Sequence, residues 1–384
     1  MQNIVGAPVT GENFYGRTKE IKRALEKLKD GNSLILSAPR RVGKTSFSKK
    51  MIELLENENW LGIYINMEHL KDEMALYNEL ADKLYEKRNI YERISRGAKL
   101  FLERTSFTIK DASIRYQDPN ARNTIRKNIL QIINDAERKE KILFVFDELA
   151  VFLNEISKKG QTPEEAKSFL NWLRSVRQES SEKAVWIFCS SISIENYLSK
   201  YDLSSTTNDM LPFDIGEMPE TEALGLIQKL AEQASLTIPT PVQKHILTLL
   251  GVALPHNIQA LFSAIIDEMP EGKTTINKKV VFDAYNYLVK NATYFGTWYQ
   301  RLRDYTDEEA NLKKILHFMC NQPEGVTEAQ LAIVVFDIPD EHDFARLAHI
   351  MRILLHDGYI IKGIDNRYSF RLNLLKDYWA YYNL

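Results

Sequence analysis

A chain of 384 residues is long enough for two or three domains of ordinary size. Its composition, 44% hydrophobic and 27% charged, is that of a folded globular protein and excludes a disordered chain. Lys and Arg total 50 and Asp and Glu total 52, so the net charge of −2 excludes a protein that binds nucleic acid by overall positive charge. The two cysteines, Cys189 and Cys320, are too few for a disulfide framework and lack the spacing of zinc ligands.

The apolar runs of the sequence are too short to cross a membrane. The longest, such as residues 184–189 and 331–336, have six residues, whereas a spanning helix needs about 20. The first residues, Met-Gln-Asn-Ile-Val, show neither the basic region nor the apolar region of a secretory signal. We therefore expect a cytoplasmic protein without a membrane partner.

Strand-like runs alternate with helical segments from about residue 33 to residue 190. Each run is apolar on both faces and is followed by at least one helix-length segment, which is typical of a parallel sheet covered by helices on both sides. The four runs are residues 33–37, 61–66, 141–146 and 185–189. Residues 106–116 alternate at period two and predict a small hairpin insertion. This part of the chain is therefore predicted to have an α/β fold.

The remainder of the chain is predicted to be mainly helical. Residues 219–288 place apolar side chains at the period of amphipathic helices, with Thr221 as a candidate N-cap. Farther along, three helical patterns precede two extended runs, as in a winged helix; these segments are residues 310–319, 327–335, 342–355 and 359–372. We predict domains at residues 1–215, 216–290 and 307–384, with a connecting helix at residues 291–306.

A phosphate-binding motif follows the first predicted strand. Residues 38–45, Ala-Pro-Arg-Arg-Val-Gly-Lys-Thr, fit G-x-x-x-x-G-K-[ST] except that Ala38 replaces the first glycine. Main-chain N–H groups of such a loop, at the start of a helix, can surround a phosphate. Lys44 can hold the β- and γ-phosphate oxygens, and the Thr45 hydroxyl can bind Mg²⁺. The strand before the loop and the helix predicted at residues 46–55 supply the context that this motif requires.

A second motif, Leu-Phe-Val-Phe-Asp-Glu, ends the third predicted strand at residues 143–148. Ligands of open α/β sheets bind at the carboxyl ends of the strands, so Asp147 is placed to meet the magnesium ion. Glu148 is placed to activate a water molecule as a general base. An Asp-Glu pair also occurs at ordinary strand ends, but its position about 100 residues after a P-loop favours the nucleotide site.

The order of these motifs resembles the archaeal-type ATPase family, which belongs to the AAA+/STAND class of P-loop NTPases and is related to origin-recognition AAA+ proteins. The resemblance covers nearly the whole chain and implies an AAA+-type core, a helical lid, a C-terminal winged helix, and ATP with Mg²⁺ as ligands. It rests on Phe14-Tyr-Gly-Arg17 with Glu20, on residues 38–45, on Phe146-Asp-Glu148 and Phe188-Cys-Ser-Ser191, and on residues 173–177, 219–223, 251–255, 295–302 and 368–378.

The resemblance implies which residues bind the nucleotide. Tyr15, Gly16 and Arg17 would lie nearest the adenine, although a plain connecting loop is the alternative. Pro255 of the lid would pack against the nucleotide where many AAA+ proteins carry a sensor arginine, and His256 is favoured as a polar residue that starts a helix. The phosphate-binding loop would comprise Ala38, Pro39, Arg40, Arg41, Val42, Gly43, Lys44, Thr45 and Ser46, with a solvent-facing position as the alternative for both of its arginines.

The resemblance also implies catalytic roles beside those of Lys44 and Glu148. Ser190 or Ser191 would be the sensor 1 residue near the γ-phosphate, although serines after a strand are also ordinary turn residues. Arg177, one helical turn after Arg174, would reach the γ-phosphate of a neighbouring subunit as an arginine finger. A solvated helix face or a carboxylate partner is the favoured alternative for both arginines.

The charge of the C-terminal region bears on its partner. Residues 308–384 hold eight Lys and Arg against eleven Asp and Glu, a net charge of −3. Duplex binding depends on neutralising phosphates, so this balance disfavours DNA, although Lys362, Arg367 and Arg371 could contact a backbone. We expect self-association or a protein partner through this region.

We therefore predict an ATP-binding, slowly hydrolysing ATPase that acts as a nucleotide-controlled molecular switch. Two alternatives remain open. One is a DNA-associated regulator or loader that uses the winged helix, and the other is a nucleotide-binding scaffold with negligible turnover.

Overall fold

The computed structural model describes residues 1–36, 38, 40–86, 119–135, 139–160, 163–191, 194–291, 295–305, 307–382 and 384. The chain divides into two compact units, which we call the sheet unit and the helical unit. The sheet unit comprises Thr18–Ser37 and Lys44–Ile215, and the helical unit comprises Met1–Arg17, Ala38–Gly43 and Gly216–Leu384. The hairpin predicted at residues 106–116 and the loop residue Pro39 lie outside the described residues.

The sheet unit is built on a parallel five-stranded sheet in the order β2-β3-β4-β1-β5. Four of its strands are the predicted runs, so the predicted α/β fold with a parallel sheet is confirmed. Asn66 lies beside Asp147 and Leu36 beside Cys189, so these four strands end along one edge of the sheet. The strands are β1 (Ser33–Leu36), β2 (Leu61–Asn66), β3 (Ile142–Asp147), β4 (Ala184–Cys189) and β5 (Met210–Phe213).

The fifth strand, β5, departs from the sequence prediction, which has four strands. Its sequence is only Met-Leu-Pro-Phe, and Pro212 lacks the N–H group that a central strand would need. In the structure β5 lies at the edge of the sheet next to β1, with Pro212 beside Ile35. Proline is tolerated there because one side of an edge strand has no neighbour to receive a donor.

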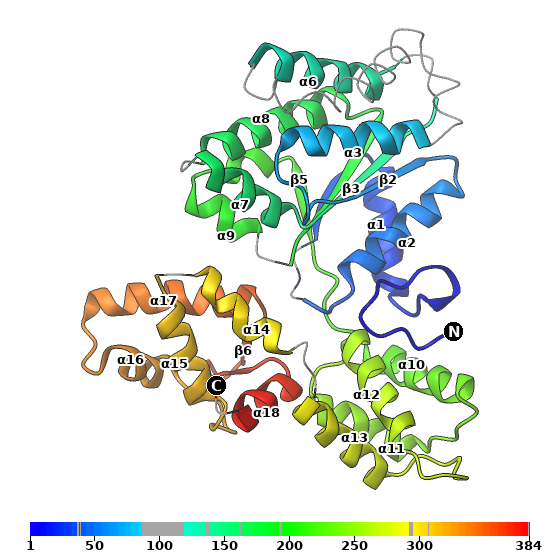
Figure 1. Ribbon diagram of the computed structural model, residues 1–384, viewed down its shortest axis with the longest axis vertical. Coiled ribbons are helices and arrows are strands. Elements are labelled where there is room, and N and C mark those ends of the chain that lie inside the picture. The colour runs from blue at the N-terminus through cyan, green and yellow to red at the C-terminus, as the bar shows by residue number, and fades with distance from the viewer. Residues whose placement is uncertain are drawn as a thin grey trace. The chain divides into compact units, whose positions relative to one another are not determined.

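Helices cover both faces of this sheet (Figure 1). On one face lie α1 (Thr18–Lys29) and α2 (Lys44–Glu56), and α2 contacts β2, β3 and β4. Helices on the other face share one core with side chains such as Phe144 and Trp186, whose stacked rings have centroids 4.1 Å apart. These helices are α3 (Glu73–Glu86), α6 (Pro119–Ile133), α7 (Leu149–Gly160), α8 (Glu164–Glu179) and α9 (Ile194–Lys200), and η3 (Ser204–Thr207) leads to β5.

The helical unit begins with η1 (Gly11–Asn13), and most of its later elements are helices. The helix predicted to be capped by Thr221 instead starts at Glu220, with Pro219 in the N-cap position. The elements are α10 (Glu220–Gln233), α11 (Thr240–Leu250), α12 (Pro255–Asp267), α13 (Lys278–Asn291), α14 (Gly296–Arg301), η5 (Leu302–Asp304), α15 (Glu309–Met319), α16 (Glu328–Phe336), α17 (Glu341–His356), β6 (Ile360–Lys362), β7 (Tyr368–Phe370) and α18 (Asn373–Tyr382).

The last 76 residues contain three helices followed by an antiparallel pair of strands, β6 and β7. Val326, before α16, exchanges main-chain hydrogen bonds of 2.8 and 2.7 Å with Tyr368 of β7. The aromatic helix α18 packs on the preceding elements of this C-terminal region through Trp379, which is fully buried. Tyr285 of α13 donates to Asp377 Oδ2 at 2.6 Å, so α18 also joins the helices of residues 220–291.

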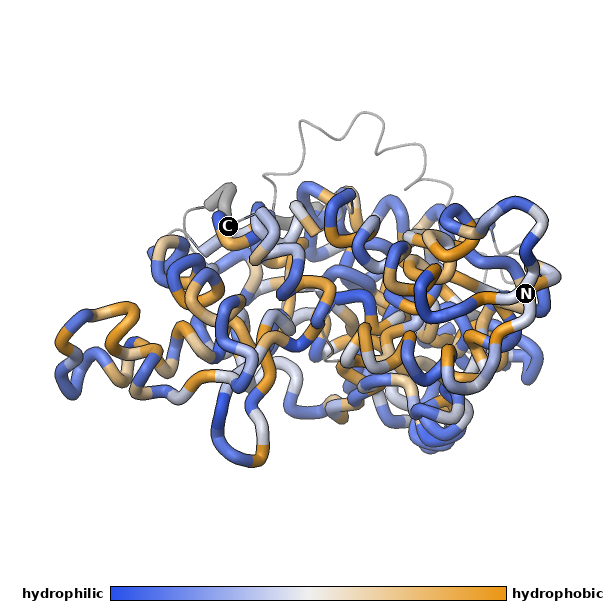
Figure 2. The backbone as a smooth tube through the Cα atoms, turned by 90° about the horizontal axis from the view of Figure 1, so that it is seen from below, coloured by the Kyte–Doolittle hydropathy of each residue, from blue (hydrophilic) through white to orange (hydrophobic). Residues whose placement is uncertain are grey.

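Hydrophobic and hydrophilic residues alternate over short stretches of the described chain (Figure 2). No single described helix has the length and apolar composition needed to cross a membrane. The helices α11 and α12, taken together as a pair bent by 120°, meet that criterion.

A buried charged network joins three helices on one face of the sheet. Arg126 of α6 donates to Glu73 Oε2 of α3 at 2.8 Å, to the Tyr77 hydroxyl at 2.9 Å and to Ser168 of α8 at 3.2 Å. The Glu73 side chain is 1% exposed, and Tyr77 also donates to it at 2.6 Å. A buried carboxylate needs such partners because its desolvation is costly.

Replacing Arg126 with alanine should therefore lower the free energy of unfolding by about 3 kcal/mol, because it leaves the Glu73 charge buried without its main partner. The measurement is chemical denaturation of the full chain. Lys127→Ala, at the exposed next position of the same helix, is the matched control and should change stability by less than about 0.5 kcal/mol. Equal effects of the two substitutions would contradict the importance of the network.

Candidate nucleotide site

The predicted phosphate-binding lysine and threonine open the helix α2 directly after the loop. Lys44 is the first residue of α2 and is 7% exposed, and Thr45 is the second. A helix N-terminus presents unpaired N–H groups and a partial positive charge, both of which favour a phosphate. The lysine therefore stands where a phosphate-binding ammonium group is expected.

The Thr45 hydroxyl meets the Asp147 carboxylate at the edge of the sheet. Thr45 Oγ1 donates to Asp147 Oδ2 at 2.7 Å, although the two residues are 102 positions apart in sequence. The same oxygen accepts a hydrogen bond of 2.8 Å from the Tyr64 hydroxyl of β2, and Oδ1 accepts one of 3.1 Å from the Glu148 N–H. Burial, and then the nearby Asp147 charge, raise the pKa of Tyr64, so its hydroxyl stays protonated as a donor.

These oxygen atoms fit a magnesium ion. Mg²⁺ prefers hydroxyl, carboxylate and phosphate oxygens, and in nucleotide sites one or two protein ligands complete its shell together with substrate phosphates. Thr45 Oγ1 and Asp147 Oδ2 already lie side by side, so the sequence-predicted pair is brought together in space.

The Glu148 carboxylate is held by the two serines that follow β4. Its Oε2 atom accepts hydrogen bonds from the Ser191 N–H at 2.8 Å, from Ser191 Oγ at 2.6 Å and from Ser190 Oγ at 3.4 Å. Glu148 itself has φ of 60°, the left-handed conformation that turns the chain from β3 into α7. Of the two candidate sensor serines, Ser191 therefore makes the closer contacts with the candidate base.

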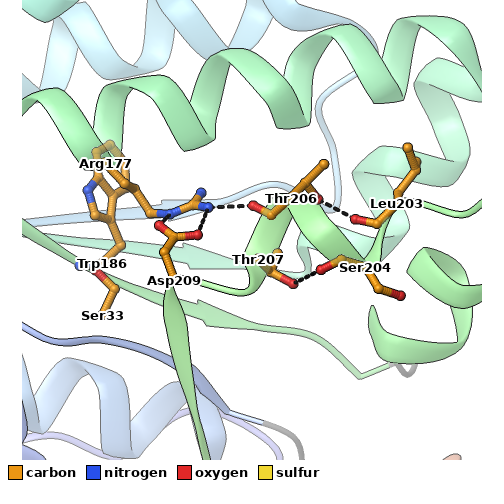
Figure 3. Close-up of polar contacts among 8 residues, drawn as sticks. All are labelled: Ser33, Arg177, Trp186, Leu203, Ser204, Thr206, Thr207 and Asp209. Carbon is orange, nitrogen blue, oxygen red and sulfur yellow. Dashed lines mark hydrogen bonds and ion pairs between the residues drawn. The ribbon is translucent and has the colours of Figure 1, made fainter.

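Arg177 lies in a buried ion pair on α8 (Figure 3). Its guanidinium donates to both carboxylate oxygens of Asp209 at 2.8 Å and to the Thr206 carbonyl at 2.5 Å, and its side chain is 2% exposed. It also lies over the Phe188 ring, 5.3 Å from the centroid. This geometry favours the carboxylate-partner alternative, in which Arg177 fixes α8 to the segment before β5. A role as an arginine finger stays a prediction and would require this pair to break.

The first part of the phosphate-binding loop belongs to the helical unit. Arg41 and Gly43 have positive φ values of 68° and 101°, and Val42 between them is buried. Ala38, Arg40 and Ser46 are partly exposed. A tight turn of this kind exposes successive N–H groups, which is the arrangement that suits an anion.

Arg17 holds the main chain of this loop. Its guanidinium donates to the Val42 carbonyl at 3.0 Å and to the Glu217 carbonyl, just before α10, at 3.1 Å. Its own N–H donates to Glu222 of α10 at 2.6 Å, and the residue is 3% exposed. The guanidinium predicted to lie near adenine thus contacts main-chain carbonyls of the loop and of the predicted lid.

Tyr15 and Gly16 are packed against the same helix, α10. Gly16 has φ of 73°, which favours glycine, and a Cβ atom there would lie 2.7 Å from the Glu222 carboxylate, which would have to move. The Tyr15 hydroxyl lies so close to Gly225 that a Cβ at that position would be 2.2 Å from it, and Lys229 covers the Tyr15 ring at 5.0 Å. Their contact with adenine stays a prediction.

Pro255 and His256 form the first turn of α12. Proline suits this position because its fixed φ fits the helix and its missing N–H would have no partner within the helix. Burial, and then the nearby Arg41 charge, lower the pKa of His256 to about 3, so His256 is neutral at pH 7. A neutral ring agrees with its interpretation as a residue of the helix start rather than a cationic phosphate contact.

Sequence reasoning missed Tyr64 as a site residue. A signal was available, because Tyr64 and Asn66 are polar groups near the end of an otherwise apolar strand and lie on one face by the period of two. The sequence predicts the strands but not their order in the sheet, so it does not place β2 beside β3. The contacts of Arg17 with main-chain carbonyls had no sequence signal of their own, and for Arg177 the sequence offered a carboxylate partner without saying which.

The family of ATPase domains found predominantly in Archaea matches residues 14–251. Among solved structures, the Walker-type ATPase PABY2304 of Pyrococcus abyssi superposes with a TM-score of 0.70 and 16% identity, covering 98% of this chain and 99% of that one. The ORC2 protein of Aeropyrum pernix, in ADPNP and ADP complexes, superposes with a TM-score of 0.52 and 12% identity, covering 96% and 95%. At these identities the likeness concerns the fold. No curated protein matches the chain in sequence.

The Arg177–Asp209 pair predicts a dependence of stability on pH. Hydrogen bonds and charge from Arg177 lower the pKa of Asp209, although its partial burial acts in the opposite direction and is the largest single influence. A lowered pKa in the folded state adds stability above the ordinary value of 3.8, and this is lost as the pH falls through the folded value. Asp209→Asn should therefore cost about 2 kcal/mol at pH 7, because it leaves the buried Arg177 charge with neutral partners only.

The difference between Asp209→Asn and the wild type should shrink when unfolding is measured at successively lower pH below 3.8. Asp82→Asn, an exposed position of α3, is the control and should have little effect at any pH. A pH-independent loss in Asp209→Asn would show that the ion pair is not its cause.

Proposed function

Because the chain belongs to the family of ATPase domains found predominantly in Archaea, we propose that it binds Mg-ATP, hydrolyses it slowly to ADP and phosphate, and acts as a nucleotide-controlled switch. The observation that carries this proposal is the meeting of Thr45, Asp147 and Glu148 at one edge of the sheet, beside the first turn of α2. These three side chains provide the oxygen ligands and the base that phosphoryl transfer to water requires.

Each of these residues has a chemical role in the proposed reaction. Lys44 neutralises charge on the β- and γ-phosphates, while Thr45 and Asp147 hold Mg²⁺. The bound metal supplies further positive charge for the phosphate oxygens. Glu148 accepts a proton from the attacking water, and the Ser190 and Ser191 groups hold its carboxylate in place.

The contacts of Glu148 support slow turnover. Three donors, from Ser190 and Ser191, hold its Oε2 atom. The carboxylate has to give up some of these contacts if it turns toward an attacking water. A base that is restrained in this way is better suited to a switch than to rapid turnover.

The contacts of Arg17 support the switch. Its guanidinium joins the Val42 carbonyl of the phosphate-binding loop to the Glu217 carbonyl shortly before α10, and its main-chain N–H donates to Glu222 of α10. A phosphate that reshapes the loop at Val42 therefore changes an interaction that also holds the predicted lid. Adenine contacts by Tyr15, Gly16 and Pro255 belong to the same proposal.

We further propose that residues 307–384 form a winged helix that binds protein, either a second copy of the chain or another partner. Its cations support this choice because they are engaged within the chain. Arg346 donates to Glu308 at 2.8 and 3.2 Å, Arg367 donates to the Gly325 carbonyl at 3.1 Å, and the Arg371 side chain is 14% exposed. At the turn from α16 to α17, the exposed apolar residues Ile333, Ile338 and Phe344 lie among acidic ones, namely Asp337, Asp340, Glu341 and Asp343.

The test of the ATPase proposal is Glu148→Gln. This variant keeps one acceptor oxygen but cannot take a proton from the attacking water. The rate of hydrolysis should therefore fall at least about 100-fold, while Mg-ATP binding is retained. The measurements are phosphate release and calorimetric titration with ATP and Mg²⁺. Glu164→Gln, an exposed position at the start of α8, removes the same charge and should behave as the wild type.

Different results would select the other candidate functions. A wild-type chain that binds Mg-ATP but releases no more phosphate than Glu148→Gln would be a nucleotide-binding scaffold. A wild-type chain that does not bind Mg-ATP would refute the proposal entirely.

The winged-helix proposal predicts weak binding of duplex DNA. Fluorescence anisotropy at low and high salt should detect no tight, salt-sensitive complex, because the net charge of −3 offers little phosphate neutralisation. Reversing Lys362, Arg367 and Arg371 to glutamate should leave that baseline unchanged. Tight binding that this triple variant abolishes would instead support a DNA-associated regulator.

A further inference from the structure

We propose that Tyr64 is a positioning residue for the magnesium ligand Asp147 and thereby sets the Mg²⁺ requirement of the enzyme. This inference rests on the proposed function, because it concerns the metal that the ATPase reaction uses. It assigns a role to a residue that lies outside the phosphate-binding loop and outside the Asp147-Glu148 motif.

The first argument is the distribution of donors around Asp147. Oδ2 accepts hydrogen bonds from Thr45 Oγ1 at 2.7 Å and from the Tyr64 hydroxyl at 2.8 Å. Thr45 is itself a proposed magnesium ligand, so its hydroxyl oxygen has to serve the metal. The Tyr64 hydroxyl, by contrast, is not a proposed ligand, so it can hold this carboxylate while Thr45 serves the metal.

The second argument is the rigidity of the strand that carries Tyr64. β2 and β3 pair in register over six residues, from Leu61 beside Ile142 to Asn66 beside Asp147. Tyr64 stands beside Val145, two residues before Asp147, and side chains two residues apart lie on the same face of a strand. The hydroxyl therefore reaches Asp147 from a backbone that is fixed to the strand of Asp147 itself.

The third argument is the contact of the Tyr64 ring with α2. The Lys49 ammonium group lies over the ring, 4.8 Å from its centroid. Lys49 follows Thr45 by one helical turn, so the ring contacts the helix that carries one proposed ligand while its hydroxyl binds the other. Such a cation–π contact restricts the ring and keeps its hydroxyl directed to Oδ2.

Loss of the Tyr64 hydroxyl is expected to change the affinity for Mg²⁺ more than the rate of hydrolysis. Outer hydrogen-bond partners orient a ligating carboxylate, and their loss lowers metal affinity about 10- to 100-fold. Tyr64→Phe removes one hydroxyl and keeps the ring and its contact with Lys49. The Asp147 carboxylate would then rotate more freely, and a higher Mg²⁺ concentration would be needed to order it.

The experiment is a Mg²⁺ titration of ATP hydrolysis by the full chain. Tyr64→Phe should raise the Mg²⁺ concentration at half-maximal rate about tenfold. Its rate at saturating Mg²⁺ should stay within about twofold of the wild type, and its affinity for a fluorescent ATP analogue in EDTA should not change. A purely structural loss would instead lower both the rate at saturating Mg²⁺ and the affinity for the analogue.

The chain offers a matched control in Tyr285→Phe. Tyr285 also donates to a carboxylate, Asp377 Oδ2 at 2.6 Å, but between α13 and α18 of the helical unit. This variant should keep the wild-type Mg²⁺ requirement. An equal shift in both variants, or none in Tyr64→Phe, would overturn the proposal.

The role of Tyr64 and the proposed function can fail separately. A wild-type chain whose hydrolysis requires Mg²⁺, with no shift in Tyr64→Phe, would refute only the role of Tyr64. A wild-type chain that neither binds nor hydrolyses ATP in any Mg²⁺ concentration would refute the proposed function and the role of Tyr64 with it.

Discussion

The hydrogen bond between the Thr45 hydroxyl and the Asp147 carboxylate depends on a single constraint, the parallel alignment of the strands. Parallel strands end along the same edge of a sheet, so the loop after β1 and the acidic end of β3 meet although β4 lies between the two strands. Tyr64 reaches this edge from β2, and the serines after β4 reach it next to Glu148. If the strand order were different, these polar groups would stand at separate places.

Three arginines of the described chain, each largely buried, have internal partners. Arg17 contacts main-chain carbonyls, Arg126 contacts Glu73, and Arg177 contacts Asp209. A buried guanidinium needs such partners because its donors lose water on folding, and its planar group can serve several acceptors at once. These three basic side chains therefore hold elements of the fold together.

In the C-terminal region, too, basic side chains at the surface bind acceptors within the chain. Arg346 and Arg367 bind acceptors of their own region, and the turn between α16 and α17 combines exposed apolar residues with acids. A surface that uses its cations internally attracts phosphates weakly, because long-range attraction depends on the local excess of charge. These contacts are the basis on which a protein partner is proposed for this region.

The sequence by itself determined four of the five strands of the parallel sheet in the described chain and singled out Lys44, Thr45, Asp147 and Glu148 as candidate site residues. Both depend on local patterns: an apolar run, a turn with glycine and a helix start. Tertiary structure alone decided the edge strand β5, the closer contact of Ser191 than of Ser190 with Glu148, the contact of Tyr64 with Asp147, and the identities of the buried partners of Arg17 and Arg177. Each of these depends on which strands and helices lie side by side. That neighbourhood is fixed by the packing of the whole core, and no short segment of sequence encodes it.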